Sequence, residues 1–282
     1  MIKMNCTIQE KATENIIVVA HRGASGGNIP CNTLAAYEIA LKQGADMIEV
    51  DVSNTLDNQL ILFHPGMEIP HLNMPVYLPL LNSNAVKKLR YVNADNTSTQ
   101  FKIAGFDDFL EQFKDRCFIN IDKFWSNPKR IYNAIKRHNM TDQVLVKSGV
   151  NEKVLKVLEG ICPELQFMPI VKDTHTSHEM LMTRNINYVG VECVFAKDSA
   201  PIAQDEFIEK MHKDGKLVWM NSIVYDRKEQ ICGGHSDDTA LTVSEDDGWG
   251  WIADKNVDFI QTDWTMMLID YLKRSGKYYK KN

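Results

Sequence analysis

The stretch VVAHRGASGGNIPCNTLAAYE (residues 18–38) joins a short apolar run to a segment with helical spacing. The apolar run, IIVVA at 16–20, is rich in β-branched residues and precedes a glycine-containing loop, so it predicts a buried strand. This strand ends on His21 and Arg22, two residue types that are seldom buried without a polar partner. We therefore expect the strand to end at a polar rim.

Nine short apolar runs of this kind recur along the chain, and segments with helical periodicity separate most of them. Alternation of strand and helix is typical of a parallel sheet built from βαβ units. Only seven residues separate the second run from the third, too few for a parallel crossover, so the third run is predicted to return antiparallel. The runs are 16–20, 47–52, 60–64, 117–122, 143–147, 166–171, 188–193, 217–221 and 258–263.

Eight parallel strands remain, and eight strand–helix units in about 250 residues match the size of a TIM barrel. The predicted fold is an α/β (β/α)8 TIM barrel with a small cap insertion after the second strand. An open doubly wound sheet is the alternative, but no G-x-G-x-x-G follows the first strand. We expect one barrel domain over 1–282, with the cap at 65–104, a segment that holds four of the nine prolines.

Composition excludes several classes of partner. A net charge of −5 with 24% charged residues offers no basic surface for nucleic acid or anionic lipid. No segment has the length and apolar character of a signal peptide or a membrane span, and the six cysteines lack the spacing of a zinc site. We therefore expect a soluble cytoplasmic protein with reduced thiols, no nucleic-acid partner and no stable membrane insertion. The sequence does not indicate its oligomeric state.

Carboxylates are expected to gather at the carboxyl ends of the strands. Glu49 and Asp51 are two residues apart in the second run, so both point to the same side of an extended chain. Asp122 ends the next parallel strand at a matching position. Three hard oxygen ligands without a thiol or clustered imidazoles favour one divalent cation, Mg²⁺ or Ca²⁺.

Basic residues are expected at the same rim. The antiparallel return brings His64 back beside the second strand, and Lys147 closes the fourth parallel strand. Imidazoles exchange protons near neutral pH, and cations offset charge on a phosphodiester. Together with His21 and Arg22, these residues predict phosphoryl chemistry on a small-molecule phosphodiester.

Each residue also has an ordinary explanation when it is considered alone. His21 could be a structural histidine at a strand end, and His64 could be a turn residue. The carboxylates of Glu49 and Asp51 could form salt bridges with Lys or Arg. The barrel hypothesis places all of them at one rim, which favours a shared site.

The order and spacing of these motifs resemble the glycerophosphodiester phosphodiesterase family over essentially the whole chain. The family has HRG, a P-E-N-T loop, G-A-D-x-I-E-x-D-V, T-x-D-G and an apolar strand that ends in histidine. The corresponding motifs here are HRG (21–23), PCNT (30–33), GADMIEVDV (44–52), TLDN (55–58), LILFH (60–64), FINID (118–122) and IQTDW (260–264).

The resemblance implies a metal-dependent phosphoric diester hydrolase that releases sn-glycerol 3-phosphate and an alcohol. Direct attack by water and a route through a cyclic phosphate both remain open. Related barrels act as lysophospholipase D or sphingomyelinase D, and a catalytically weakened phosphate-ester binding protein is a further alternative. The resemblance implies His21 and His64 as the acid/base pair, Arg22 as a phosphate contact, and Glu49, Asp51 and Asp122 as metal ligands.

Three positions depart from the family pattern. Cys31 replaces the glutamate of P-E-N-T, and Pro65 replaces the aspartate that commonly follows the second histidine. Phe124 stands where the family has a lysine. Strand alternation places Lys123 on the face opposite Asp122, so we expect Lys147 to substitute for the missing lysine.

Two further residues are candidate substrate contacts. Glu192 ends the sixth parallel strand and could line the pocket or pair with a lysine. Trp219, near the end of the seventh, resembles a family position near the substrate but could equally pack in the core. Asp237 belongs to an irregular acidic segment and is expected to be a solvated loop residue.

Overall fold

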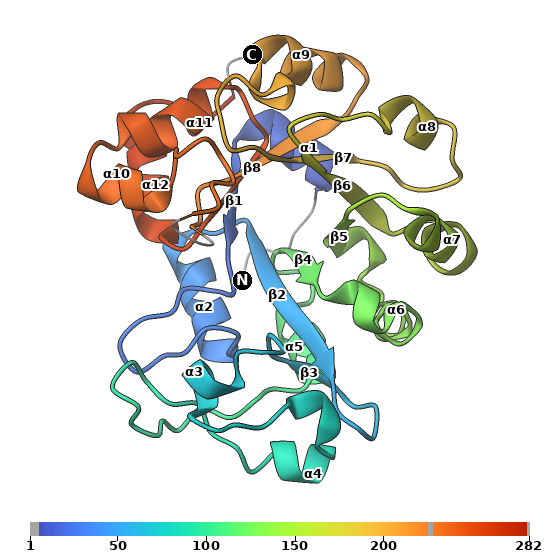
Figure 1. The fold of residues 1–282 in the computed structure, drawn as a ribbon, viewed down its shortest axis with the longest axis vertical. Helices are drawn as coiled ribbons and strands as arrows, with labels where there is room; N and C mark the ends of the chain where they lie inside the picture. The colour runs from blue at the N-terminus through green and yellow to red at the C-terminus, as the bar shows by residue number, and fades with distance from the viewer. Residues whose placement is uncertain (1–5, 225–227, 281–282) are drawn as a thin grey trace.

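The computed structural model describes residues 6–224 and 228–280, which form a closed barrel (Figure 1). The hydrogen-bonded order is β1-β9-β8-β7-β6-β5-β4-β2-β3, and a further β1–β2 pairing closes the ring. All pairings are parallel except β2–β3. The predicted (β/α)8 TIM barrel is confirmed. The strands are β1 (Ile17–Ala20), β2 (Met47–Asn54), β3 (Leu60–Leu62), β4 (Phe118–Asp122), β5 (Val144–Ser148), β6 (Gln166–Lys172), β7 (Gly190–Val194), β8 (Leu217–Asn221) and β9 (Phe259–Thr262).

Helices surround the strands in Figure 1. The α-helices are α1 (Ile8–Glu14), α2 (Leu34–Gln43), α3 (Glu68–Leu72), α4 (Ser83–Val86), α5 (Phe106–Phe113), α6 (Pro128–Arg137), α7 (Glu152–Ile161), α8 (His178–Met182), α9 (Asp205–Lys213), α10 (Asp237–Thr242), α11 (Trp251–Asp254) and α12 (Thr265–Arg274). Short 3-10 turns are η1 (Leu78–Leu80), η2 (Phe124–Ser126), η3 (Thr141–Gln143) and η4 (Pro201–Ala203), and η5 (Asp246–Gly250) is a π-turn.

Apolar side chains fill the barrel interior. Val19, Phe118 and Leu145 form part of one buried cluster with residues from the other strands. Ile8 and Ala12 of α1 belong to the same cluster, so this helix packs against the interior side chains. Because barrel interiors are packed in layers, this apolar filling leaves the carboxyl ends of the strands for polar chemistry.

The register of the strands brings polar residues to one end. Asp51 of β2 pairs with Asp122 of β4, and Glu49 pairs with Asn120. Beyond this level β2 leaves the barrel and pairs with β3, as Val52 opposite Leu62 shows. The predicted antiparallel return is confirmed, although β3 ends two residues before His64.

The segment 65–104 contains α3, η1 and α4, and its residues Leu72, Leu78 and Tyr91 form an apolar cluster with Phe63, which precedes the segment. Figure 1 shows α3 to the left of the β2–β3 hairpin and α4 below it. The segment is therefore a small packed unit attached to the barrel by that hairpin.

All six cysteines are unpaired, in line with the expectation of free thiols. Within 6–224 and 228–280, no helix combines the length and the apolar character that a membrane crossing requires.

Candidate active site

The turn after β1 is built by left-handed backbone. Arg22 has φ +55° and Gly23 has φ +79°. A Cβ atom on Gly23 would lie 2.7 Å from the carbonyl carbon of Ala36, so only glycine fits there. The turn directs the backbone N–H of Arg22 at Glu49 Oε2 (2.9 Å), and Arg22 Nε lies 3.0 Å from Asp51 Oδ2. The HRG motif therefore joins the first strand to the acids of the second.

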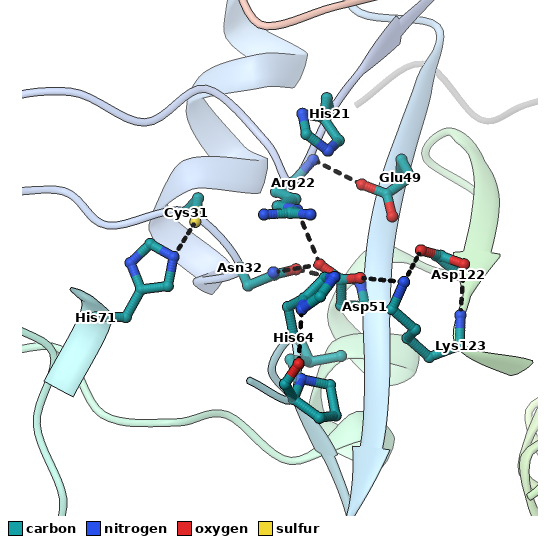
Figure 2. A network of polar contacts seen from close by, with 12 residues as sticks. His21, Arg22, Cys31, Asn32, Glu49, Asp51, His64, His71, Asp122 and Lys123 are labelled. Atoms are coloured by element: carbon teal, nitrogen blue, oxygen red, sulfur yellow. Dashed lines mark hydrogen bonds and ion pairs between the residues drawn. The ribbon is translucent and has the colours of Figure 1, made fainter. Parts of the chain in front are cut away.

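The three predicted acids form one cluster (Figure 2). Glu49, Asp51 and Asp122 each offer an oxygen, and these oxygens lie within 4.8 Å of one another. Burial and the neighbouring charge of Asp51 raise the pKa of Glu49 to about 8. Asp51 is fully buried, and its Oδ1 receives no hydrogen bond from any residue of the described chain. Crowded hard oxygens with an unsatisfied buried atom fit a divalent cation.

Asn32 holds the acid cluster in place, and the sequence analysis did not single it out. Its Nδ2 donates to Asp51 Oδ2 (2.8 Å), and its Oδ1 accepts from the backbone N–H of Asp51 (3.2 Å) and from the hydroxyl of Tyr37 (2.8 Å). Asn32 has φ +55°, a conformation that asparagine tolerates better than most residues. Its place in the PCNT motif was the available signal.

The expectation that Lys123 points away from the acids is wrong. Its backbone is left-handed (φ +61°), which breaks the alternation of the strand directly after Asp122. Lys123 Nζ therefore lies 2.6 Å from Asp122 Oδ2 and 4.0 Å from Asp51 Oδ1. Burial would raise the pKa of Asp122, but the charge and hydrogen bonds of Lys123 outweigh it and lower that pKa. The ammonium group of Lys123 thus supplies the positive charge beside the acids that we had expected from Lys147.

His21 has a carboxylate partner that the motif comparison did not provide. Its Nδ1–H donates to Asp263 Oδ1 at 2.8 Å. Burial alone would lower the pKa of His21, but the hydrogen bond to Asp263 and the charge of Glu49 produce a net rise. His21 is therefore oriented at one nitrogen, and its pKa lies above the ordinary value for histidine.

Asp237 is buried rather than solvated, which corrects the expectation for this residue. Its Oδ1 accepts hydrogen bonds from Ser222 Oγ, Trp249 Nε1 and Thr262 Oγ1, and its Oδ2 accepts from the backbone N–H of Asp263. Burial raises the pKa of Asp237 to about 6 despite these bonds. Asp237 therefore holds the loop that presents Asp263 to His21.

His64 is oriented by backbone rather than by a carboxylate. Its Nδ1 lies 2.9 Å from the carbonyl oxygen of Pro65, so Nδ1 carries the proton and Nε2 is left for other partners. The preceding residue, Phe63, donates its N–H to the Asp51 carbonyl (3.0 Å), which keeps His64 next to the acid-bearing strand. The carbonyl of Pro65 thus takes the orienting place of the missing aspartate.

Lys147 and Glu192 form an ion pair across the barrel, at 2.9 Å. Lys147 Nζ also lies 3.6 Å from the centroid of the Trp219 indole ring. Trp219 itself is fully buried and stacks on Phe259 in the barrel core. Lys147 and Glu192 therefore line the cavity, whereas Trp219 packs in the core, the alternative that its sequence position left open.

A cavity of about 350 Å³ opens at the carboxyl ends of the strands. Its wall includes His21, two of the three acids and the Lys147–Glu192 pair. The side chains of Asn120, Asn221 and Gln261 also line it, and the sequence analysis gave none of these a committed role. His21, Arg22, Glu49, Asp51, Asp122, Lys147 and Glu192 are thus gathered at one end of the barrel. His64, which the rim hypothesis also placed there, is not among the residues that line this cavity.

Sequence comparisons give named relatives. A family model described as a domain of unknown function matches residues 167–272. The Bacillus subtilis protein named Uncharacterized protein YqiK is 27% identical, covering 76% of this chain and 88% of its own. A glycerophosphodiester phosphodiesterase of Caldanaerobacter subterraneus is 28% identical, covering 53% and 64%. The Mycobacterium tuberculosis protein named Probable glycerophosphodiester phosphodiesterase 2 is 24% identical, covering 93% and 92%.

Solved structures show the same fold. A glycerophosphoryl diester phosphodiesterase from Parabacteroides distasonis has a TM-score of 0.77 at 14% identity, covering 99% of both chains. An Oleispira antarctica phosphodiesterase, solved in complex with the product sn-glycerol-3-phosphate, has a TM-score of 0.65 at 18% identity, covering 92% of this chain and 97% of its own.

Most of these relatives and neighbours are named as phosphodiesterases, and this chain shares the barrel fold of the solved ones. The chain is similar to the glycerophosphodiester phosphodiesterases among these relatives and neighbours, and it diverges from all of them in sequence. Its divergence shows in identities of 28% or less for these five proteins and in the departures at Cys31 and Pro65.

Proposed function

We propose that this protein hydrolyses glycerophosphodiesters to sn-glycerol 3-phosphate and an alcohol, with a divalent cation and with His21 and His64 as the acid/base pair. The observation that carries the proposal is the cluster of Glu49, Asp51 and Asp122 beside His21 at one cavity. The names of the relatives and the product bound in the Oleispira structure support the same substrate class.

The cation would be held by Glu49, Asp51 and Asp122. Carboxylate oxygens and the absence of sulfur or imidazole among these three residues favour Mg²⁺ or Ca²⁺. When bound, it would supply Lewis-acid stabilisation of charge on the phosphoryl oxygens. Arg22 and Lys123 contribute two positive charges beside the three carboxylates, which leaves one formal negative charge for the cation to balance.

The two histidines divide the proton transfers. Each has its Nδ1 engaged, His21 by Asp263 and His64 by the Pro65 carbonyl, so Nε2 is the nitrogen available for transfer. One imidazole takes the proton of the attacking hydroxyl, and the other gives a proton to the departing alkoxide. Water and the glycerol 2-hydroxyl both suit this arrangement as the nucleophile, and we assign no preference between them.

Substrate contacts follow from the charges in the cavity. Lys147 and Glu192 line it together with the amides of Asn221 and Gln261. Ammonium, carboxylate and amide groups together suit hydroxyls and a phosphate on a small polyol. We propose that these side chains bind the glycerol phosphate part of the substrate. We also propose that segment 65–104 is a cap beside the entrance of this cavity.

The test is release of glycerol 3-phosphate from glycerophosphocholine or glycerophosphoethanolamine with added Mg²⁺ or Ca²⁺. We expect EDTA to abolish turnover and His21→Ala to reduce it by about 10² or more. His138→Ala, which changes the histidine that caps the C-terminus of α6 and pairs with Asp107, is the matched control. Equal turnover by His21→Ala would reject the assignment of His21. Faster hydrolysis of a detergent-solubilised lysolipid than of the glycerophosphodiesters would favour the lysophospholipase D alternative. Tight binding of glycerol phosphate without turnover of any substrate would favour the binding-protein alternative.

A further inference from the structure

A second cavity of about 370 Å³ adjoins the first, and His21 lines both. Arg22 and Asp263 also line the second cavity, next to His21. The rest of its wall comes from Ser25, Cys31, Met67, His71 and Trp264, which belong to the β1–α2 loop, the segment 65–104 and the start of α12. Figure 2 shows Cys31 and His71 paired on the side of Arg22 away from Asp122. The two cavities therefore flank His21.

The inner wall of the second cavity is uncharged. Cys31 Sγ lies 3.7 Å from His71 Nε2. Burial raises the pKa of the Cys31 thiol to about 11, so it stays protonated at neutral pH. Burial and the nearby charge of Arg22 lower the pKa of His71, which favours the neutral imidazole. Thiol and imidazole are thus a neutral pair where the family motif has a glutamate.

The part of the second cavity's wall around His21 offers no surplus of negative charge. Asp263 is the single acid among the described residues that line the second cavity, and it already accepts the Nδ1–H of His21. Arg22 adds a permanent positive charge to the same wall. A cationic group such as choline or ethanolamine would therefore find no unpaired carboxylate among the described residues that line this cavity.

Apolar and polarizable groups form the outer wall. Met67 contributes a thioether, and Trp264 contributes an indole that is 49% exposed at the surface. Thioethers and aromatic rings pack well against aliphatic groups. The first cavity differs, because Lys147, Glu192 and Gln261 line it with groups suited to hydroxyls. The polar wall of the first cavity and the apolar outer wall of the second therefore suit different alcohol groups of a phosphodiester.

We propose that the second cavity receives the leaving-alcohol arm of the substrate and selects an uncharged, aliphatic arm over a cationic one. This inference rests on the proposed function and names its substrate class. In the net reaction the oxygen of water bonds to phosphorus, the bond from phosphorus to the leaving oxygen breaks, and the leaving oxygen takes up a proton. The released alcohol is then a neutral aliphatic alcohol, and glycerol phosphate remains in the first cavity.

The test compares two esters of glycerol 3-phosphate with the same shape, one with choline and one with its neutral carbon analogue 3,3-dimethylbutanol. We expect kcat/KM to be about tenfold higher for the neutral ester, the effect of about 1.4 kcal/mol of charge interaction. Cys31→Glu places a carboxylate in the cavity and should lower this ratio about tenfold. Cys31→Ser is the matched neutral control and should keep the ratio of the unmodified protein.

The ratio of two substrates in one variant cancels any effect of the substitution on folding or cation binding. Equal or faster hydrolysis of the choline ester by the unmodified protein overturns the inference and leaves the proposed function intact. The same ratio in Cys31→Glu and Cys31→Ser also overturns it, because charge at Cys31 would then have no effect. If neither ester is hydrolysed, the proposed function and this inference fail together.

Discussion

His21 Nδ1 lies 2.8 Å from Asp263 Oδ1, which joins the first and last strands of the barrel across 242 positions of sequence. This hydrogen bond fixes the ring tautomer and contributes to the raised pKa of His21. We predict that Asp263→Asn lowers kcat/KM by about 10²-fold. It should also move the limb of the pH–rate profile that belongs to His21 to lower pH, since the charge that stabilises the imidazolium is removed.

The measurement is kcat/KM from pH 5 to pH 9 for the unmodified protein and for Asp263→Asn. Asp270→Asn, which changes an exposed carboxylate of α12 that pairs with Arg274, is the control. A reduced rate with an unmoved profile would mean that Asp263 does not act through the pKa of His21.

Cation binding should depend on pH through Glu49. Its pKa of about 8 means that Glu49 holds a proton at neutral pH when no cation is bound, and binding must displace that proton. Affinity for Mg²⁺ or Ca²⁺ should therefore fall as pH falls below about 8, by at most about tenfold per pH unit. Calorimetry in two buffers of different ionisation enthalpy measures both the affinity and the protons released.

Two variants make the cation experiment specific. Glu49→Gln should weaken binding and flatten its pH dependence, while Glu206→Gln, an exposed acid on α9, should change neither. Affinity that is independent of pH in the unmodified protein would contradict the role of Glu49 as a protonated ligand.

Asp237→Asn should destabilise the fold, because Asp237 is buried and accepts hydrogen bonds through both carboxylate oxygens. The amide nitrogen would face the backbone N–H of Asp263, which now donates to Asp237 Oδ2 at 2.8 Å. A buried donor left without an acceptor costs about 1–3 kcal/mol. Denaturant unfolding measures this cost, and Asp238→Asn, its exposed neighbour, should lie within about 0.5 kcal/mol of the unmodified protein. Equal stability of the two variants would show that the hydrogen bonds of Asp237 do not stabilise the fold.

Gly23→Ala should be strongly destabilising. The residue has φ +79°, and the added Cβ would lie 2.7 Å from the backbone carbonyl carbon of Ala36. The left-handed conformation alone costs about 1–2 kcal/mol for a residue with a Cβ, and the backbone contact adds to it. Gly26→Ala is the matched control, since its Cβ would meet nothing within 4 Å. Thermal unfolding that gives the same midpoint for both variants would contradict the steric argument.

Local periodicity was sufficient for the strand-borne acids. Glu49 and Asp51 share a face because side chains alternate along a strand, and the parallel register sets Asp122 opposite Asp51. The short connection before β3 required an antiparallel return, which carried His64 back beside β2. These predictions depended on neighbours in sequence and on one rule of chain connection.

The same reasoning from strand alternation gave the wrong side-chain direction for Lys123, because of its backbone conformation. Alternation assumes extended residues, but Lys123 is left-handed (φ +61°) at the point where the strand ends. Its ammonium therefore turns to Asp122 instead of away from it. At Trp219 the sequence left open whether the side chain contacts substrate or packs in the core. The tertiary structure decides this, because Phe259 at the paired position of β9 stacks on the indole ring and Trp219 is buried.

The amino-acid order thus established the barrel, the edge where its chemistry lies and the residues that each strand contributes, because these follow from period, spacing and chain connection. Closure of the barrel established the partners: Asp263 for His21, Asp237 for Asp263, and the neutral pair of Cys31 and His71 beside them. Such contacts join residues far apart in the chain, and no local pattern encodes them, since they depend on where separate loops meet after the ring is closed.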